Sequence, residues 1–265
     1  MSILTTLDPR RTPAPAADPG VAVRLSGVTK RFGGGAVVLD DVSLTVGDGE
    51  FVCLLGASGC GKSTLLNLVA GLDAPTAGTI AVPGGRTALM FQESALLPWL
   101  TASQNVELAL RLRGVGRRER RSRAGELLAL VRLEGAGAKR VHELSGGMRQ
   151  RVAMARALAQ EAGVLLMDEP FAALDAITRD VLHEELVRLR ASQALTVVFV
   201  THNVREAVRL GDRVVLLSSR PGRIAREYDI AIGSPRRIES PEVARLSVEI
   251  TDDLRAEIRR HGGQP

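Results

Sequence analysis

The chain has 265 residues, of which 45% are apolar, and its formal net charge is +5. This apolar content excludes a disordered chain, and the length fits one large α/β domain with or without a small subdomain. Two cysteines, Cys53 and Cys60, provide neither a disulfide framework nor a paired metal motif, which indicates a reducing cytosol. Because no apolar run approaches the ~20 residues of a membrane span, we expect a soluble protein on the cytoplasmic side.

The first predicted feature is a flexible N-terminal tail over residues 1–19, which holds four prolines and no periodic pattern. Short apolar segments typical of strands follow at residues 21–25, 37–39, 42–46 and 51–55. A glycine-rich loop then precedes a predicted helix over about 62–70. Two further strands are predicted at residues 79–82 and 87–91.

Helical spacing of apolar residues dominates the middle of the chain, from about residue 98 to 158. Buried strands return at residues 164–167, 196–200 and 214–217, with helical segments between them. This alternation predicts a largely parallel sheet flanked by helices. A last helix starts at Ser240, and its apolar stripe is expected to dock on the main domain; the stripe consists of Leu246, Ile250, Leu254 and Ile258.

The glycine-rich loop matches the spacing G-x-x-x-x-G-K-[ST], and its residues are Gly56, Ala57, Ser58, Gly59, Cys60, Gly61, Lys62, Ser63 and Thr64. It lies between a predicted strand and a predicted helix, which is the context of a phosphate-binding loop. Its glycines let successive backbone N–H groups surround an anion, and the helix adds its positive end. The pattern predicts that Lys62 reaches the terminal phosphates of a nucleotide and that the Ser63 hydroxyl ligates Mg²⁺.

A second motif is a buried strand that ends in two acids, Asp168 and Glu169. A carboxylate at a strand end beside a phosphate loop can hold Mg²⁺ through its water shell, and Asp168 fits that position. Glu169 would then polarise the attacking water as a general base. Acidic strand ends are common, so this interpretation depends on the presence of the phosphate loop.

A third motif lies between the first two and spans residues 144–150, Leu-Ser-Gly-Gly-Met-Arg-Gln. On its own this segment is an ordinary helix-capping turn, but with the other two motifs it resembles the signature motif of ABC-transporter nucleotide-binding domains. The resemblance covers residues 21–224. It implies an α/β fold, namely the ABC-type P-loop NTPase domain with an antiparallel β subdomain and an α-helical subdomain, and an ATPase of the translocase class. The domain is expected over residues 20–239, with its helical subdomain at about 98–158 and a C-terminal helical tail at 240–265.

The resemblance also implies roles for single residues. Phe32 resembles the aromatic residue that stacks on adenine, where the family usually has Tyr. Gln92 resembles the glutamine that touches Mg²⁺ and senses the transmembrane partner. Residues 174–175 resemble the loop that crosses between subunits, and His202 resembles the switch histidine that contacts the γ-phosphate.

In this family the signature motif of one copy faces the phosphate loop of another. Ser145, Gly146 and Gly147 would therefore bind the γ-phosphate of ATP held by a second copy of the chain, so that two ATP molecules are sandwiched in a homodimer. The resemblance further implies integral-membrane permease subunits as partners and, indirectly, an extracytoplasmic solute-binding protein. It places the chain peripherally at the cytoplasmic face of the inner membrane.

Three segments narrow the resemblance to importers of nitrate, aliphatic sulfonates or taurine; these segments are residues 91–100, 167–171 and 219–224. The last of them is the most diagnostic. The chain departs from that group at Ala172, where Gly is usual, and at Val141, where Pro is frequent. The sequence does not identify the solute, because the binding protein and the permease would select it.

Two alternatives stay open at this point. The basic charge would suit a soluble ABC ATPase that acts on nucleic acid or ribosomes. Such proteins usually carry two fused nucleotide domains or a long coiled-coil insertion, and the five arginines within residues 117–123 lack interleaved aromatics for base stacking, so no nucleic-acid partner is expected. A phosphate-loop kinase of a small molecule is opposed by the signature motif.

Overall fold

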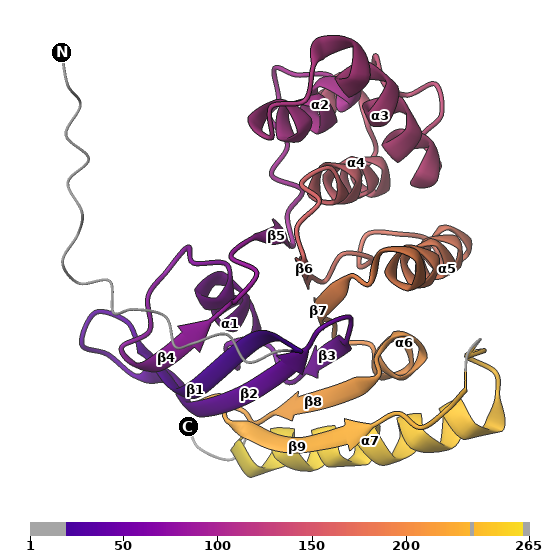
Figure 1. Ribbon diagram of the computed structural model, residues 1–265. Coiled ribbons are helices and arrows are strands. Elements are labelled where there is room, and N and C mark those ends of the chain that lie inside the picture. Colours follow the sequence, from indigo (N-terminus) through magenta and orange to yellow (C-terminus); the bar gives the residue numbers. More distant parts are fainter. Residues whose placement is uncertain (1–19, 234–235, 262–265) are drawn as a thin grey trace, which may run out of the picture.

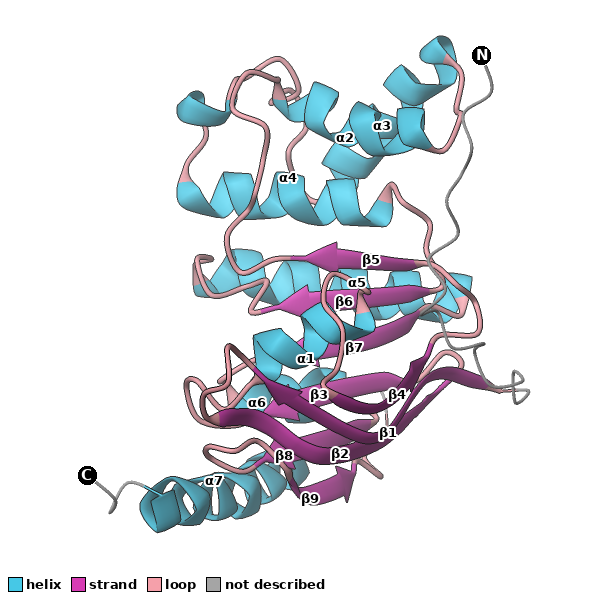
Figure 2. Ribbon diagram, turned by 90° about the vertical axis from the view of Figure 1, so that its left-hand side faces the viewer, coloured by secondary structure: helices cyan, strands magenta, loops and turns pink. Residues whose placement is uncertain are grey.

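The computed structural model describes residues 20–233 and 236–261, so the predicted N-terminal tail lies outside the described residues. The strands form two sheets (Figures 1 and 2). The smaller sheet is antiparallel, has the order β2–β1–β4, and consists of β1 (Val21–Arg31), β2 (Val37–Gly47) and β4 (Ala77–Ala81). This sheet is the antiparallel β subdomain expected of an ABC-type domain.

Strand β2 is longer than the sequence predicted, because it continues through the two acids that separate its apolar segments. Asp41 adopts a φ of 53°, and the register with β1 shifts between the pairs Val28–Val42 and Lys30–Leu39. The irregularity keeps both apolar segments in one strand while breaking the alternation that the sequence pattern relies on. The prediction of two separate strands was therefore wrong.

The larger sheet has six strands in the order β5–β6–β7–β3–β8–β9. They are β3 (Phe51–Leu55), β5 (Thr87–Met90), β6 (Val164–Asp168), β7 (Thr196–Val200), β8 (Arg213–Leu217) and β9 (Ile224–Asp229). All neighbours from β5 to β8 pair in parallel, as predicted, whereas β9 pairs antiparallel with β8. The sequence did not predict β9, because Tyr228 is the one buried residue of this edge strand.

Helices cover both faces of the larger sheet (Figure 2). Helix α1 (Lys62–Val69) packs between the two sheets, and α5 (Ala176–Gln193) and α6 (Val204–Leu210) lie on the opposite face. The helical section forms a separate group beyond β5 (Figure 1), with α2 (Ala102–Leu112), α3 (Arg117–Leu130) and α4 (Gly146–Leu158). Within the described residues, no helix has both the length and the apolar content to cross a membrane.

The alternation of side chains along β3 divides the core in two. Phe51 and Cys53 point into the cluster that also contains the helical section and α5, α6 and the C-terminal helix. Val52 and Leu54 point into the cluster between the two sheets, where Leu65 of α1 packs. Every residue of β3 is fully buried, so the strand that leads into the phosphate loop is held on both faces.

The C-terminal helix α7 (Pro241–His261) docks beside α6 and β9 (Figure 1). The predicted apolar stripe is confirmed for Ile250, which is fully buried, and for Leu246 and Leu254, which pack partly buried against the core. The prediction that Ile258 docks was wrong, because the core ends before this last turn of the helix and leaves the side chain 45% exposed. The hydroxyl of Tyr228 donates to Asp253 and ties the helix to β9; this hydrogen bond lowers the pKa of Asp253.

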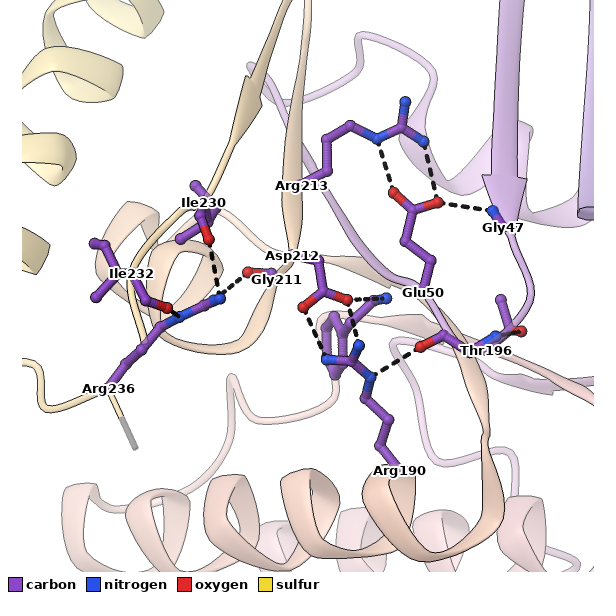
Figure 3. Close-up of polar contacts among 12 residues, drawn as sticks. Gly47, Glu50, Arg190, Thr196, Gly211, Asp212, Arg213, Ile230, Ile232 and Arg236 are labelled. Atoms are coloured by element: carbon purple, nitrogen blue, oxygen red, sulfur yellow. Dashed lines mark hydrogen bonds and ion pairs between the residues drawn. The ribbon is translucent and has the colours of Figure 1, made fainter. Parts of the chain in front are cut away.

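A cluster of ion pairs fixes the amino end of the larger sheet (Figure 3). Arg213 donates through Nε to Glu50 (2.9 Å), whose carboxylate also accepts the backbone N–H of Gly47 at 2.7 Å. Arg190, near the end of α5, donates to both carboxylate oxygens of Asp212. These contacts join β2, β3, β8 and α5 at the amino ends of the strands, on the opposite side of the sheet from the phosphate loop. The carboxyl ends of the parallel strands are thereby left to build the site.

Candidate functional site

The phosphate loop connects β3 to α1, and its glycines are required by its backbone geometry. Gly59 and Gly61 have φ angles of 74° and 103°, in the left-handed region that favours glycine. A Cβ on Gly61 would lie 2.6 Å from Cδ2 of Leu39 in β2, so a larger residue there would displace this fully buried side chain. Gly61 is also the residue that precedes the first turn of α1, which directs the positive end of this helix toward the loop.

A cavity of about 320 Å³ opens beside this loop. The residues that line it are Val38, Ser58, Gly59, Gly61, Lys62, Ser63, Thr64, Gln92, Asp168 and Glu169. Six residues of the phosphate loop meet there with Asp168 and Glu169, at the end of β6, and with Gln92, from the loop after β5. The sequence did not predict Val38, because a valine in a strand carries no sign of the cavity that it faces.

Lys62 is the one basic residue in the lining of this cavity, and it is 8% exposed. Its ammonium group donates to the carbonyl oxygens of Gly56 (2.8 Å) and Ala57 (2.9 Å) at the start of the loop. Across the cavity, burial raises the pKa of Asp168, while a hydrogen bond from Ser63 and the charge of Lys62 oppose this rise. Asp168 is therefore hydrogen-bonded to Ser63 and lies within the electrostatic influence of Lys62.

Glu169 lines both this cavity and a smaller one. Its Oε2 lies 3.2 Å from Nδ1 of His202, which lines the small cavity but not the large one. Glu169 adopts a φ of 46°, an unusual angle for a residue with a side chain, and its N–H donates to the carbonyl of Val200 at 3.0 Å. Strained backbone of this kind concentrates at functional sites. The structure thus pairs the predicted general base with the predicted switch histidine.

Helix α4 holds the loop that contains Gln92. The Gln150 side chain donates to the carbonyl of Gln92 at 2.9 Å. The guanidinium of Arg156 donates to two carbonyls further along the loop, those of Ser94 (2.9 Å) and Ala95 (2.7 Å). Burial of this guanidinium lowers the pKa of Arg156. The sequence predicts neither role. Both contacts join residues about 60 positions apart, for which a local pattern gives no signal.

The signature residues lie at the amino end of α4 and do not line the cavity. Ser145 caps the helix by accepting the N–H of Met148 at 3.2 Å, and Ser145 and Gly146 are exposed. Gly147 packs against Leu174, since a Cβ on this glycine would lie 3.1 Å from Cδ2 of Leu174. Within one chain, the signature motif and the phosphate loop are therefore separate.

Some predicted nucleotide contacts lie away from the cavity lining. Phe32 is 51% exposed on the turn between β1 and β2, with the Lys30 ammonium 4.7 Å from its ring centroid. Gly56, Ala57 and Cys60 belong to the loop but do not face the cavity. Cys60 is 1% exposed, and burial raises the pKa of its thiol against the opposing charge of Lys62.

Known proteins resemble this chain over most of its length. The profile of the ABC transporter family matches residues 39–172. The taurine import ATP-binding protein TauB of Mesorhizobium japonicum is 47% identical over 234 residues, which cover 83% of this chain and 91% of that protein. The aliphatic sulfonates import ATP-binding protein SsuB 1 of the same organism is 45% identical over 247 residues, which cover 91% of this chain and 92% of that protein.

Among solved structures, the dimer of the ATP-binding cassette MJ0796 bound to ADP and Pi matches with a TM-score of 0.74 and 35% sequence identity. The match covers 80% of this chain and 100% of that one. The similarity to the sequence relatives and to this structure extends well beyond the three motifs and covers most of the chain. The chain therefore belongs to the ABC transporter family, among its ATP-binding, ATP-hydrolysing subunits.

Proposed function

We propose that the chain is the motor subunit of an importer, which couples ATP hydrolysis to uptake of taurine, aliphatic sulfonates or nitrate through a separate permease. The observation that carries the proposal is the cavity that joins the phosphate loop to Gln92, Asp168 and Glu169. The identity of 47% to a taurine import protein and 45% to an aliphatic sulfonates import protein supports the solute class. The chain would work at the cytoplasmic face of the inner membrane.

In this proposal Ser63, Gln92 and Asp168 would hold Mg²⁺ beside the nucleotide. Hydroxyl, amide and carboxylate oxygens are ligands that Mg²⁺ prefers, and all three side chains line one cavity. The part of the chain that the structure describes has no cluster of three or more His, Cys, Asp or Glu suited to a metal. The phosphates and water would therefore complete the coordination, and the ion would offset charge on the transferring phosphate.

Hydrolysis would depend on Glu169, which would take the proton from the water that attacks the γ-phosphate. His202 would orient the Glu169 carboxylate through their 3.2 Å contact and would approach the γ-phosphate when ATP is bound. Lys62 and the loop N–H groups would stabilise the charge on the phosphates. These groups act together only when the nucleotide fills the cavity.

A second copy of the chain would complete the site. Ser145 and Gly146 are exposed at the positive end of α4, outside their own cavity, and are free to face the phosphates bound by another copy. The structural relative MJ0796 is a dimer with ADP and Pi, which supports this arrangement. Phe32, exposed beside the cavity-lining strand β2, would stack on adenine from the same copy.

The proposal is tested with the chain assembled with its permease in vesicles that enclose the solute-binding protein. Taurine, an alkanesulfonate or nitrate is enclosed together with that protein, ATP is added outside, and the rate of ATP hydrolysis is measured. We expect one of these solutes to raise the rate several-fold and sulfate to leave it unchanged. If none of them stimulates hydrolysis while RNA or ribosomes stimulate the chain alone, the alternative of a soluble ABC ATPase is the correct one.

Permease docking is expected at residues 93–101, the segment that follows Gln92. Leu96 is 8% exposed and packs in the core, whereas Trp99 is 66% exposed. An exposed tryptophan is a frequent anchor of an interface. The Trp99→Ala variant is therefore expected to keep the fold and the basal ATPase rate, but to lose about tenfold or more in affinity for the permease, the size of effect of an interface hot spot.

Leu112→Ala provides the matched control for Trp99→Ala. Leu112 is 80% exposed at the end of α2, so this variant also removes an exposed apolar side chain from the helical section. Affinity for detergent-solubilised permease, measured by pull-down titration, should fall for Trp99→Ala alone. An equal loss in both variants, or no loss in either, would show that Trp99 is not the anchor.

A further inference from the structure

The turn between β8 and β9, residues 218–223, closes on itself through a short set of hydrogen bonds. The backbone N–H of Ser218 donates to the carbonyl of Arg223 at 2.9 Å, and the N–H of Arg223 donates to the Ser218 hydroxyl oxygen at 3.0 Å. The same hydroxyl donates to the carbonyl of Pro221 at 2.9 Å. These hydrogen bonds hold the turn in a defined conformation.

This turn lies directly against the phosphate loop. Nε of Arg220 donates to the carbonyl oxygen of Gly59 at 3.1 Å. A Cβ on Gly59 would lie 2.6 Å from Nη2 of Arg220, and a Cβ on Gly222 would overlap the carbonyl oxygen of Cys60. The turn thus contacts two consecutive residues of the loop, Gly59 through the Arg220 side chain and Cys60 through the backbone at Gly222.

The same turn also holds the strand that walls the cavity. The N–H of Gly222 donates to the carbonyl of Val38 at 2.8 Å, and the N–H of Asp40 donates to the carbonyl of Gly222 at 3.0 Å. Nε of Arg223 donates to the carboxylate of Asp40 at 3.0 Å. Since Val38 lines the cavity, the turn joins one wall of the site to the phosphate loop.

We propose that Arg220 is a positioning residue for ATP, which acts through the backbone of Gly59. The inference rests on the proposed nucleotide site. A loop with glycines at positive φ has many accessible conformations, and only those with converging N–H groups accept the phosphates. The hydrogen bond from Arg220 favours such a conformation before ATP arrives, so its loss reduces the competent fraction and weakens apparent affinity by the same factor.

A purely structural role fits Arg220 poorly. Its side chain is exposed, and neither core cluster contains residues of the turn before Ile224. Among the described residues, its guanidinium makes one hydrogen bond, the contact with Gly59. Removing the side chain leaves no buried cavity behind, so we expect the fold to tolerate the change.

The test compares Arg220→Ala with Arg220→Lys in the full chain, with Arg226→Ala as matched control. Arg226 is an exposed arginine on β9 that pairs with Asp253, away from the loop. For Arg220→Ala we expect the KM for ATP to rise about fivefold with kcat within about twofold, the scale of one lost hydrogen bond. Arg220→Lys keeps a charged donor and should restore most of the KM. Arg226→Ala should leave the KM unchanged.

Melting temperatures measured with and without Mg-ATP separate positioning from folding. Positioning predicts that Arg220→Ala melts within about 3 °C of the unmodified chain when no nucleotide is present. It should then gain less stabilisation from ATP. An unchanged KM for ATP overturns the inference, whatever the melting temperature of the variant. Normal hydrolysis by Lys62→Ala would instead overturn the proposed nucleotide site, so the two failures are distinguishable.

Discussion

Replacing Lys62 with alanine is expected to reduce ATP hydrolysis by about 10²-fold or more and to weaken ATP binding without eliminating it. Lys62 is the one basic residue in the cavity lining, which also holds Asp168 and Glu169. Without the ammonium group, the phosphates of ATP would face two carboxylates with no opposing side-chain charge. The backbone N–H groups and the end of α1 remain, so part of the affinity survives.

Hydrolysis is measured by phosphate release, and binding by isothermal titration calorimetry. Lys139→Ala is the matched control, because it removes an exposed lysine from the helical section and lowers the net charge by the same amount. The control should hydrolyse ATP at the original rate. Turnover by Lys62→Ala close to that of the control would refute the assignment of the phosphate loop.

The second large effect is expected from Glu169→Gln, which should retain ATP binding and slow hydrolysis by roughly 10² or more. Glutamine matches the size of glutamate but lacks a basic oxygen to receive the proton of water. The side chain can still contact His202, which lies 3.2 Å from Glu169, so the geometry of the site is expected to persist. Unhydrolysed ATP should then hold two copies of the chain together.

Size-exclusion chromatography with ATP and Mg²⁺ measures this association, and Glu134→Gln is the control. Glu134 is an exposed acid after α3, so this variant makes the same chemical change away from the site. A dimer should appear for Glu169→Gln alone and disappear when ATP is omitted. Normal hydrolysis by Glu169→Gln, or an elution volume that ATP does not change, would contradict the assigned role.

The sequence predicts those parts of the fold that depend on short-range patterns. The apolar runs 51–55 and 196–200 coincide with β3 and β7, because both strands are buried on two faces. The edge strand β9 was missed, since its charged side chains face solvent. The phosphate loop follows from spacing alone, because a fixed set of glycines is needed where the backbone itself surrounds the ligand.

The sequence does not predict contacts between distant segments of the chain. Arg220 is 161 positions from Gly59, and Arg156 is 61 from Ala95. An arginine that donates to a backbone carbonyl leaves no complementary residue type at the other position, so neither pair can be recognised from composition or spacing. Val38 shows the same limit, because its identity would be equally suited to a core position.

Helix α4 connects the signature residues to the loop after β5. Its amino end carries Ser145 and Gly146, and its Gln150 and Arg156 side chains hold the backbone of the loop after β5. At 1.5 Å per residue, about 15 Å separates position 146 from position 156 along the helix axis. While those hydrogen bonds are intact, a displacement of residues 92–95 also displaces α4 as a rigid body, including its amino end. A force applied beside one ATP site is thus delivered to the surface that would face the other.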